Sequence, residues 1–579
     1  MVNRSIGQAF VVFALLGAAL YANALGNSFH YDDRHSIEHN KHLRSLANIP
    51  SYFVDPGTFS SERRGTMFRP LLLSSYAANY AVHGGWVPGY RIANLLIHVL
   101  CSTLLFALAH KWWGIPRDAW ALGLLFLLHP LHGEPINYIS SRSDLLVGCF
   151  YLLAVLWSVE RPYGSWSAFA AALMSKSVAI TLPIVVWAAE WIRDGRVRLR
   201  NRYLAGVLLL SGVYLTTIVA NRFLTSSLAK TPRTFDVQLW TQTKALVYYI
   251  WLFCMPRALS VEHPFVVADR WSDPVVVLAG LVLLSLGGLA IVGRRRVEAQ
   301  AFGFFVLALL PATLMPLNIL VSERRMYLAS TGLVVIAVWA WGQMAARRRR
   351  FAIITGSSLC LVFAAMVWTR NPVWLNDITL WEDAVAKGPG MFRARANLGL
   401  AYGKQERWVE AINELEQALA IKGDYADAWV ELGNIYHDTG QLELAERGYR
   451  QALALDPSLE GVYYNLGNLA MGRKDVDGAM RFYRETLERN PGFADAHNNL
   501  GQALELTGDF AAARQQYEAA IIDNPHLGGT WFNLGGVAER LGDKQQALVA
   551  YRRAQELLVA LPEYQNYAVR AEQAIQRLE

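Results

Sequence analysis

The stretch AWVELGNIYHDTGQLELAERGYRQALALDP, residues 428–457, is the main part of a unit that recurs at a fixed interval of about 34 residues through the last third of the chain. Its Leu-Gly pair returns at the same interval, at Leu398-Gly399, Leu432-Gly433, Leu466-Gly467, Leu500-Gly501 and Leu534-Gly535. A large residue keeps step with the last four pairs, at Tyr449, Tyr483, Tyr517 and Tyr551. Because the small residues let two helices approach closely and the Tyr fills the space beside them, the pattern predicts stacked pairs of helices.

A period of about 34 residues with these signature positions is typical of tetratricopeptide (TPR) repeats. The sequence therefore predicts a TPR superhelix over residues 392–579, made of five repeats and a capping helix at 563–578. Residues 371–391 keep part of the same register and are expected to form a helix that connects the array to what precedes it. A solenoid of this kind offers a concave surface for an extended peptide or a helix, although a spacer or a dimerisation module would carry the same signature.

Upstream of the repeats, residues 1–370 consist of long apolar runs separated by short basic clusters. Over the whole chain 53% of the residues are hydrophobic and 17% are charged, which does not fit an ordinary soluble protein. The net charge of +7 does not indicate a nucleic-acid-binding protein, because the Arg residues lie between apolar runs. The Cys residues lie in or at the ends of these runs without metal-ligand spacing, so neither a zinc site nor a disulfide framework is expected.

Apolar runs of about 20 residues are long enough to cross the hydrocarbon core of a membrane. Residues 165–192 are too long for one crossing and carry Lys176 near their centre. We therefore expect two short helices that meet at Ser175-Lys176, with the Lys facing an outer cavity, because a charge at mid-membrane is costly. Counting this hairpin as two, the sequence predicts about eleven spans, the others at residues 8–26, 92–110, 119–131, 145–160, 203–222, 274–293, 299–317, 326–345 and 351–369.

Clusters of Arg between the spans predict which side of the membrane each loop faces, and they run from Arg193 to Arg202, from Arg294 to Arg296 and from Arg347 to Arg350. They share one side only if 165–192 is a hairpin and 238–256 lies in the membrane interface without crossing. With these loops inside, the N-terminus is cytoplasmic, and both residues 27–91 and the TPR array are extracytoplasmic. Arg4, the apolar run after it and Ala22-Asn23-Ala24 also imitate a cleavable signal peptide, and either interpretation leaves residues 27–91 outside.

The predicted outer loops carry the residues that could do chemistry. The first loop, NSFHYDDRHSIEHNKHL (27–43), places Asp32 and Asp33 directly after the first span. HPLHGEPINYISSRSDLL (129–146) and MPLNILVSERRMYLAS (315–330) bring further groups to the same side, namely His129, His132, Glu134, Arg142, Asp144, Glu323, Arg324 and Arg325. Arg69 in FRPLLLSSY (68–76) and Lys176 add two more cations. Cations at the membrane interface could bind a phosphate group. A carboxylate could take a proton from an acceptor hydroxyl. Any single Arg could instead extend from a helix end to the interface without a functional role.

The order of the motifs in this chain resembles one family over nearly its whole length. The motifs are, in sequence, the acidic pair, RPLLLSSY, HPLHGEPINYISSRSDLL, the Ser-Lys hairpin, SERRMYLAS and the TPR array. It is the family of transmembrane-and-TPR-repeat O-mannosyltransferases and their bacterial relatives, within the GT-C superfamily of glycosyltransferases. The resemblance implies an all-α fold, with a GT-C-like transmembrane bundle over 1–370 and the TPR superhelix behind it. It also implies an inverting glycosyltransferase that moves a sugar from a polyprenyl-phosphate-linked donor to a protein hydroxyl on the extracytoplasmic face.

The resemblance also implies roles for individual residues. Asp33, preferred slightly over Asp32, would take the proton of the acceptor hydroxyl, and Glu134 would be a second acid. Arg324 would bind the donor phosphate, with help from Lys176, Arg325 and Arg69. Glu323, Arg142, Asp144 and His132 would support the site, and Arg142 and Asp144 are expected to organise their loop as an ion pair. Related chains often have Ser-Lys-Glu in the hairpin, whereas Ser175-Lys176-Ser177 lacks the acid, which puts a role for that acid and the sugar preference in doubt.

No metal or other cofactor is expected. A divalent ion stays open as an alternative, with His129, His132 and Glu134 as its ligands, but turn packing around Pro130 and Pro135 explains the spacing of these His residues equally well. Two other functions stay open as well. One is a membrane-anchored TPR scaffold without catalysis, and the other is a GT-C enzyme acting on a glycan or a lipid. The short loops favour a bacterial inner membrane, with the TPR array recruiting a protein or peptide acceptor.

Overall fold

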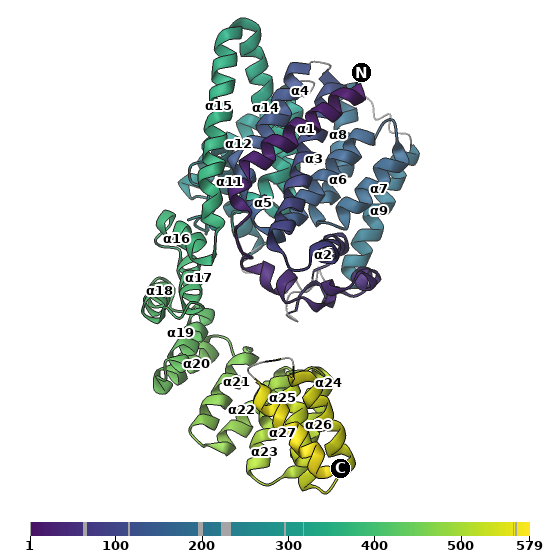
Figure 1. Ribbon diagram of the computed structural model, residues 1–579. Helices are drawn as coiled ribbons and strands as arrows, with labels where there is room; N and C mark the ends of the chain where they lie inside the picture. The colour runs from purple at the N-terminus through teal and green to yellow at the C-terminus, as the bar shows by residue number, and fades with distance from the viewer. Residues whose placement is uncertain are drawn as a thin grey trace. The chain divides into compact units, whose positions relative to one another are not determined.

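The described part of the computed structural model comprises residues 2–61, 67–113, 116–194, 201–221, 233–293, 297–316, 318–559, 561 and 564–579. These residues form α-helices and short helical turns, and no β-strand occurs among them. The predicted all-α class is therefore confirmed. The chain divides into two compact units, Met1–Pro389 and Gly390–Glu579, which hold helices α1 to α16 and α17 to α27 (Figure 1).

The first unit is a bundle of helices around one large apolar core. Its helices are α1 (Val2–Leu20), α2 (Pro70–His83), α3 (Val87–Trp113), α4 (Pro116–Leu128), α5 (Gly133–Asn137), α6 (Arg142–Trp157), α7 (Pro162–Leu173), α8 (Leu182–Asp194), α9 (Asn201–Ala220), α11 (Phe235–Cys254), α12 (Pro274–Val292), α13 (Val297–Leu314), α14 (Met326–Arg347), α15 (Arg349–Arg370) and α16 (Asp377–Lys387). In the bundle, α3 packs against α1, α4 and α6, and α13 packs along α14.

Seven segments of this unit are long and apolar enough to cross a membrane: Val87–Lys111, Ile139–Trp157, Tyr203–Ala220, Pro274–Val292, Val297–Leu314, Glu323–Arg347 and Arg349–Trp374. The expected number of about eleven is therefore too high by this criterion. The other four predicted spans are α1, whose apolar part is Arg4–Leu20, and the short helices α4, α7 and α8. With 12 or 13 residues each, these three helices reach about 20 Å, less than the roughly 30 Å of a bilayer core.

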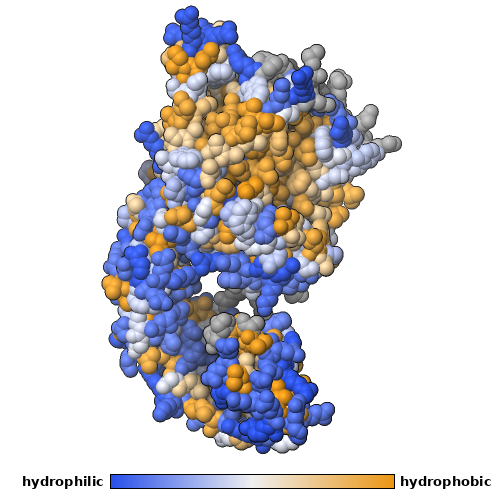
Figure 2. Space-filling view, viewed as in Figure 1, coloured by the Kyte–Doolittle hydropathy of each residue, from blue (hydrophilic) through white to orange (hydrophobic). Residues whose placement is uncertain are grey.

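The surface of the bundle agrees with a membrane location, and the protein is a multi-pass membrane protein. Figure 2 shows hydrophobic residues gathered in a broad band across the first unit, with hydrophilic residues at the two ends of that band. The most apolar segment, Pro274–Val292, keeps only 11% of its apolar window buried inside the protein, so its Leu and Val side chains face outward. Such a surface is expected of a helix in contact with lipid.

The break predicted in the hairpin is present. The helix α7 ends at Leu173, a 3-10 turn covers Ser177–Thr181, and α8 begins at Leu182. Of the three Arg clusters, the one from Arg347 to Arg350 lies at the turn between α14 and α15. Arg294 to Arg296, like Arg196, Arg198 and Arg200, lie outside the described residues.

One close helix contact gives a stability prediction. A Cβ added to Gly332 of α14 would lie 2.2 Å from the carbonyl oxygen of Ala301 on α13, so Gly332→Ala must push two backbones apart. We expect a loss of about 1–3 kcal/mol of stability, which is typical of overpacking. Gly303 on α13 has no atom within 4 Å of the same position, so Gly303→Ala is the matched control. Thermal unfolding of the purified chain in detergent measures both, and equal melting temperatures would contradict the expectation.

The second unit consists of helix pairs in the predicted repeat register. The pairs are α17 (Phe392–Gly403) with α18 (Trp408–Ile421), α19 (Ala426–Asp438) with α20 (Leu442–Leu455), α21 (Glu460–Gly472) with α22 (Val476–Arg489), α23 (Ala494–Leu506) with α24 (Phe510–Asp523) and α25 (Gly528–Arg540) with α26 (Lys544–Leu558), and α27 (Gln565–Leu578) packs on the last pair. A Cβ on Gly467 would lie 2.5 Å from the ring of Tyr483, and the other Leu-Gly pairs that face a Tyr are as close. The TPR array and the physical reason for its small residues are thus confirmed.

Candidate active site

The loop after α1 is anchored by a fully buried arginine. Arg91, at the start of α3, donates from Nη1 to the carbonyl of Asn27 at 2.5 Å and from Nη2 to the carbonyl of Ser28 at 2.6 Å. Hydrogen bonds to a charged donor are roughly twice as strong as neutral ones, and a buried guanidinium left without them would be costly. Arg91 therefore fixes the backbone that leads into the acidic pair.

Three buried asparagines join this loop to two distant segments. Asn27 donates to the side-chain oxygen of Asn137 at 3.2 Å and to the carbonyl of Asn371 at 3.1 Å, and Asn137 donates to the side-chain oxygen of Asn371 at 3.2 Å. The first loop, the 129–146 segment and the end of α15 thus meet in one polar network. Such a network specifies a single arrangement because every unmet partner would be a buried, unsatisfied group.

The chain that leaves α15 also contacts the first loop directly. The amide of Ser28 donates to the carbonyl of Leu375 at 3.0 Å. His30 lies 3.1 Å from Asp377 through Nδ1, and Arg34 donates to the same carboxylate at 2.8 Å. Residues 371–377 therefore lie at the same end of the bundle as the acidic pair.

Asp33 is completely buried and its hydrogen bonds are those of a structural residue. Its Oδ1 accepts from the amide and the hydroxyl of Ser140, at 2.6 and 2.5 Å, and its Oδ2 accepts from the amide of His30 at 3.1 Å. Burial raises the pKa of Asp33 above its ordinary value, although the Ser140 hydroxyl, the charge of His30 and the two backbone amides favour the ionised form. The carboxylate ties the first loop to the turn that starts α6.

Asp32 has the opposite environment. Its side chain is 36% exposed, and His35 lies 3.5 Å from its Oδ1. Burial alone would raise the pKa of Asp32, but the hydrogen bond with His35, the charge of Arg324 and the hydroxyl of Tyr138 together hold that pKa below its ordinary value. The pKa values of the two neighbouring acids are thus shifted in opposite directions, and Asp32 is the more accessible of the two.

Arg324 contacts Glu134 and interacts through its charge with two further carboxylates. Its Nε is 4.0 Å from Oε1 of Glu134, and its backbone amide donates to Oε2 of the same residue at 3.1 Å. Its guanidinium lies over the ring of Tyr138, 5.5 Å from the centroid, and its charge interacts with those of Asp32 and Asp144. The side chain is 25% exposed, so the cation remains accessible.

Lys176 forms a short ion pair with Asp144, from Nζ to Oδ1 at 2.5 Å and to Oδ2 at 2.6 Å. Arg69 donates to the hydroxyl of Ser143 at 3.2 Å, and its charge interacts with those of Asp144 and Arg324. The charge of Lys176 likewise interacts with those of Arg69 and Arg324. Three cations from separate parts of the chain, Arg69, Lys176 and Arg324, therefore gather around the single carboxylate of Asp144.

Arg142 does not pair with Asp144, so the ion pair suggested from the sequence is wrong. Arg142 is buried and donates instead to the side-chain oxygens of Asn94 and Asn79 and to the carbonyl of Tyr90. Its guanidinium also lies over the ring of Tyr76, 4.7 Å from the centroid. Arg142 organises the junction of α2, α3 and α6, because a buried guanidinium needs all of these acceptors.

Three other predicted residues make their contacts outside the group of Arg69, Lys176 and Arg324. Both ring nitrogens of His132 are used, Nδ1 by the carbonyl of Phe126 at 2.7 Å and Nε2 by the hydroxyl of Ser330 at 2.9 Å. Arg325 donates to the carbonyls of Leu320 and Ile319 at 3.0 and 2.7 Å. Glu323 is fully buried beside His263, at 3.4 Å, and Arg370, at 3.5 Å. These side chains hold the polypeptide around the site.

The residues named as possible metal ligands are engaged elsewhere. Nε2 of His129 contacts the carbonyl of Phe253 at 3.1 Å, and its Nδ1 accepts from the amide of Leu131 at 3.2 Å. Its ring stacks on Phe253 at a centroid distance of 4.5 Å. Within the described ranges of the chain, no group of three or more His, Cys, Asp or Glu residues could hold a metal ion.

Glu134 gives a prediction on pH. Burial raises the pKa of Glu134 from its ordinary 4.5 to about 8, the carboxylate of Glu323 adds to this, and the charge and amide of Arg324 oppose it. Because the folded protein keeps this proton where the unfolded chain has lost it, its stability falls as the pH rises from about 4.5 to about 8. Glu134→Gln should remove this loss. Melting temperatures of both proteins between pH 5 and pH 8.5 measure it, and parallel curves would contradict the assignment.

Several residues that build the site were not singled out from the sequence. Tyr138 lies inside the quoted polar stretch, and a phenol between Glu134 and Arg142 was a signal that could have been used. Arg91 was a lone charge at the edge of a predicted span, which is costly unless it is paired. The three asparagines and Asp377 gave no local signal, because their partners lie far away along the chain.

Comparison with known proteins agrees with both parts of the chain. A family model described as tetratricopeptide repeat matches residues 464–528 and 508–563, and one described as TPR repeat matches residues 399–440 and 433–472. Among solved structures, YrrB, described as a TPR protein with an unusual peptide-binding site, is 18% identical with a TM-score of 0.28 and covers 33% of this chain and 97% of its own. The pilus biogenesis factor PilW is 19% identical with a TM-score of 0.29, covering 32% of this chain and 90% of its own.

Three similar proteins are matched over 69–77% of this chain. Protein O-mannosyl-transferase Tmtc1 of Drosophila melanogaster is 25% identical over 539 residues, covering 72% of this chain and 62% of that protein. TMTC3 of Homo sapiens is 22% identical, covering 77% and 55%, and TMTC4 of Mus musculus is 25% identical, covering 69% and 65%. This chain thus spans between about half and two thirds of the length of these relatives. Over most of its own length it is similar to protein O-mannosyl-transferases, as the order of its motifs indicated.

Proposed function

We propose that this protein is an inverting glycosyltransferase that moves a sugar from a polyprenyl-phosphate-linked donor to the hydroxyl of a protein, on the extracytoplasmic side of the membrane. Mannose is the sugar to test first, because the similar proteins are named O-mannosyl-transferases. The observation that carries the proposal is the convergence of Arg69, Lys176 and Arg324 around Asp144 at one end of an apolar bundle, where the charge of Arg324 also interacts with that of Asp32.

The balance of charge in this cluster favours an anionic ligand. Asp144 neutralises one of the three cations, and Lys176 is the cation that contacts it. Arg324 and Arg69 then exceed the nearby negative charge unless Asp32 and Glu134 are both ionised, and the raised pKa of Glu134 disfavours its ionisation. A phosphate suits this site, because the guanidinium fork of Arg matches two of its oxygens.

The reaction follows from these positions. The ionised carboxylate of Asp32 takes the proton of the acceptor hydroxyl as its oxygen attacks the anomeric carbon of the sugar. The bond from that carbon to the phosphate oxygen breaks, and the electron pair stays on the polyprenyl phosphate. Arg324, with Arg69 and Lys176, stabilises the charge that develops on this leaving group. Attack opposite the leaving group inverts the anomeric carbon.

We assign the base to Asp32 in preference to Asp33. The carboxylate oxygens of Asp33 accept three hydrogen bonds from backbone and Ser140, and the side chain has no exposed surface. Asp32 is partly exposed and its charge interacts with that of Arg324, so it can reach both a substrate hydroxyl and the charge that assists the leaving group.

The TPR array is proposed to recruit the acceptor on the same side as Asp32. The chain leaves α15 at that end of the bundle, because Asn371, Leu375 and Asp377 all contact the first loop. No described segment after residue 389 is apolar enough to span a membrane. An array that starts on the side of the active site therefore stays there.

The proposal is tested by transfer in vitro. Membranes that contain the protein are incubated with a radiolabelled polyprenyl-phosphate mannose and extracytoplasmic proteins, and labelled protein is measured after alkaline release of O-linked sugar. We expect label on protein that depends on the intact chain. No transfer from any polyprenyl-phosphate sugar would leave a non-catalytic scaffold, and label on lipid or glycan alone would change the acceptor.

Sidedness is tested separately by Gln441→Cys, an exposed position on the TPR array. A membrane-impermeant maleimide should label it in intact cells. Arg348→Cys, at the turn between α14 and α15, is the control that should stay unlabelled until the membrane is opened. Labelling of Arg348→Cys but not of Gln441→Cys in intact cells would place the array in the cytoplasm and contradict the proposed recruitment.

A further inference from the structure

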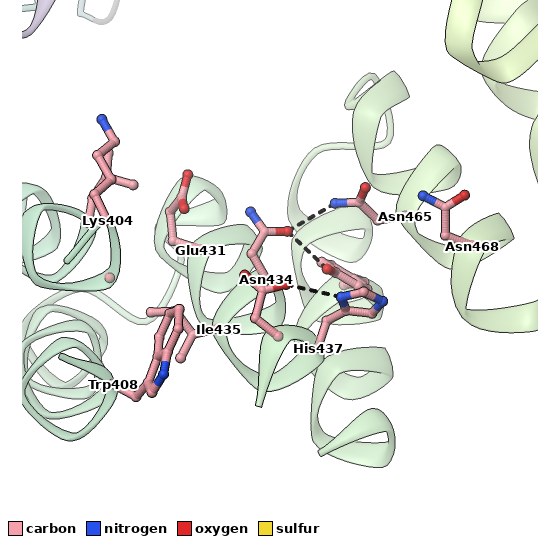
Figure 3. Close-up of a pocket in the computed structure, with 12 residues that line it drawn as sticks. Lys404, Trp408, Glu431, Asn434, Ile435, His437, Asn465 and Asn468 are labelled. Atoms are coloured by element: carbon pink, nitrogen blue, oxygen red, sulfur yellow. Dashed lines mark hydrogen bonds and ion pairs between the residues drawn. The ribbon is translucent and has the colours of Figure 1, made fainter. Parts of the chain in front are cut away.

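The TPR array contains a polar cavity of about 370 Å³. Its walls come mainly from the first helices of three successive repeats, α17, α19 and α21. Polar and apolar groups share these walls, among them Lys404, Trp408, Glu431, Asn434, Ile435 and Asn465 (Figure 3). Because the cavity opens on helices that the repeat presents side by side, a ligand lying along the array would cross it.

A row of asparagines runs from this cavity into the following repeat. Asn434 accepts from the hydroxyl of Tyr449 and from the amide of Asn465, both at 2.9 Å, and Figure 3 shows the contact with Asn465. One repeat later, Asn468 accepts in the same way from Tyr483 at 2.9 Å and from Asn499 at 3.0 Å. The hydroxyl and the neighbouring amide thus fix the orientation of each of these side-chain amides. Amides held at a regular spacing match the donors and acceptors of an extended backbone.

The row is broken at the first junction. The position before each Leu-Gly pair holds an asparagine in four repeats, Asn397, Asn465, Asn499 and Asn533, but it holds Glu431 in the second repeat. The two positions that would complete the same contact there are Leu400 and Leu415 instead of Asn and Tyr. Glu431 therefore has a leucine where its counterparts Asn465 and Asn499 each have an amide partner. The cavity lies at this departure from the pattern.

Glu431 is an acid in the wall of the cavity, where the amide of Asn434 and the charge of Lys404 act on its carboxyl group. No ion pair within 4.0 Å involves it in the described part of the array. Burial raises the pKa of Glu431, the amide of Asn434 and the charge of Lys404 oppose this, and Asp427 adds to it. Asp438, in the wall of the same cavity, is a further acid. The walls thus hold two acids, Glu431 and Asp438, and one lysine, Lys404, so the balance of charge favours a cation.

We propose that this cavity binds the side chain of a Lys or Arg in an extended peptide, with Glu431 as the counter-ion and the asparagine row alongside the peptide backbone. The inference rests on the proposed recruitment of a protein acceptor by the array, and it names the chemistry of the recognised segment. The apolar part of the wall, formed by Leu400, Trp408 and Ile435, suits the methylene stem of such a side chain. A half-buried carboxylate gains more from a cation than an exposed one, because water screens it less.

Binding of short fluorescent peptides to the purified full-length protein tests this inference. The peptides differ at one central position, which is Lys, Arg, norleucine or Glu, in a background of Ser, Thr and Ala. Fluorescence anisotropy gives their dissociation constants. We expect Lys and Arg to bind about tenfold more tightly than norleucine, which is the effect of one partly screened ion pair. Glu431→Gln should reduce this preference to about twofold, and Glu431→Lys should favour the Glu peptide.

The matched control is Glu488→Gln, which removes the same charge from an exposed position on α22 and should leave the tenfold preference intact. Equal binding of the Lys and norleucine peptides to the unaltered protein would overturn the inference, as would a preference that survives Glu431→Gln. Failure of every peptide to bind would overturn it too. Because the measurement uses no donor and no transfer, it is independent of whether the protein proves to be a glycosyltransferase.

Discussion

Asp32→Asn is expected to lower the rate of sugar transfer by about 10²–10⁴-fold, the contribution typical of a positioned general base. Asn keeps the size and one oxygen of the side chain but cannot accept the proton of the acceptor hydroxyl. The variant should fold normally, because Asp32 is partly exposed and, among the described residues, its carboxylate is hydrogen-bonded to His35 and Tyr138. The rate is measured with radiolabelled polyprenyl-phosphate mannose at saturating donor, and it is expressed per mole of folded protein.

Asp33→Asn is the neighbouring control. Asp33 accepts from two groups of Ser140 and from the amide of His30, so the substitution should lower the melting temperature. Transfer per folded molecule should change much less than in Asp32→Asn. If Asp33→Asn removes transfer while the melting temperature is unchanged, or if Asp32→Asn is fully active, the base has been assigned to the wrong acid.

Arg324→Gln is expected to lower transfer by about 10²–10³-fold, the loss found when one group that stabilises transition-state charge is removed. A neutral amide cannot offset the charge that builds on the departing phosphate. The affinity for the donor should fall as well, since the same guanidinium binds the phosphate before the reaction. Initial rates over a range of donor concentrations separate the two effects as changes in kcat and in KM.

The adjacent arginine provides the control for this experiment. Arg325→Gln removes an equal charge from the next position in the chain, but Arg325 points to the carbonyls of Ile319 and Leu320. Its rate should therefore stay within a few-fold of the unaltered protein. Equal losses in the two variants would show that the general positive charge of this turn matters more than the position of Arg324.

The array could be predicted almost completely from the sequence, because each repeat uses the same few contacts. The close approach at Gly467 can be predicted from one repeat alone, because its partner Tyr483 lies on the second helix of the same repeat. A signal that returns in every repeat is also averaged over five copies. A fold that depends on local contacts repeated along the chain can therefore be predicted from its sequence.

The site was only partly predictable, because the sequence does not show which charged side chain contacts which partner. The sequence pointed to the segments that hold Asp32, Asp144 and Lys176, because charged residues beside apolar runs are conspicuous. It did not indicate that Lys176 would pair with Asp144 or that Arg142 would be buried among neutral acceptors. Those partners are set by how α2, α3, α6 and α7 pack, and several carboxylates were equally plausible before that packing was seen.

The predicted span count is too high by the criterion of length for a related reason. Hydropathy finds apolar residues, but it does not show whether a helix is long enough to cross or is shielded by its neighbours. The helices α4 and α7 are apolar and end after 13 and 12 residues, and other helices of the bundle cover part of their surfaces. Such helices count as spans on composition and fall short on length.

The contact between Asp377 and His30 fixes the position at which the chain leaves the bundle. Phe392, the first residue of the array, follows soon after Asp377, with only the short helix α16 and a turn between them. Under the proposed recruitment, a polypeptide bound to the array is tethered to the bundle through this short connection, and tethering raises its effective concentration above its concentration in bulk. The same proposal then requires only a weak affinity of the array for the acceptor.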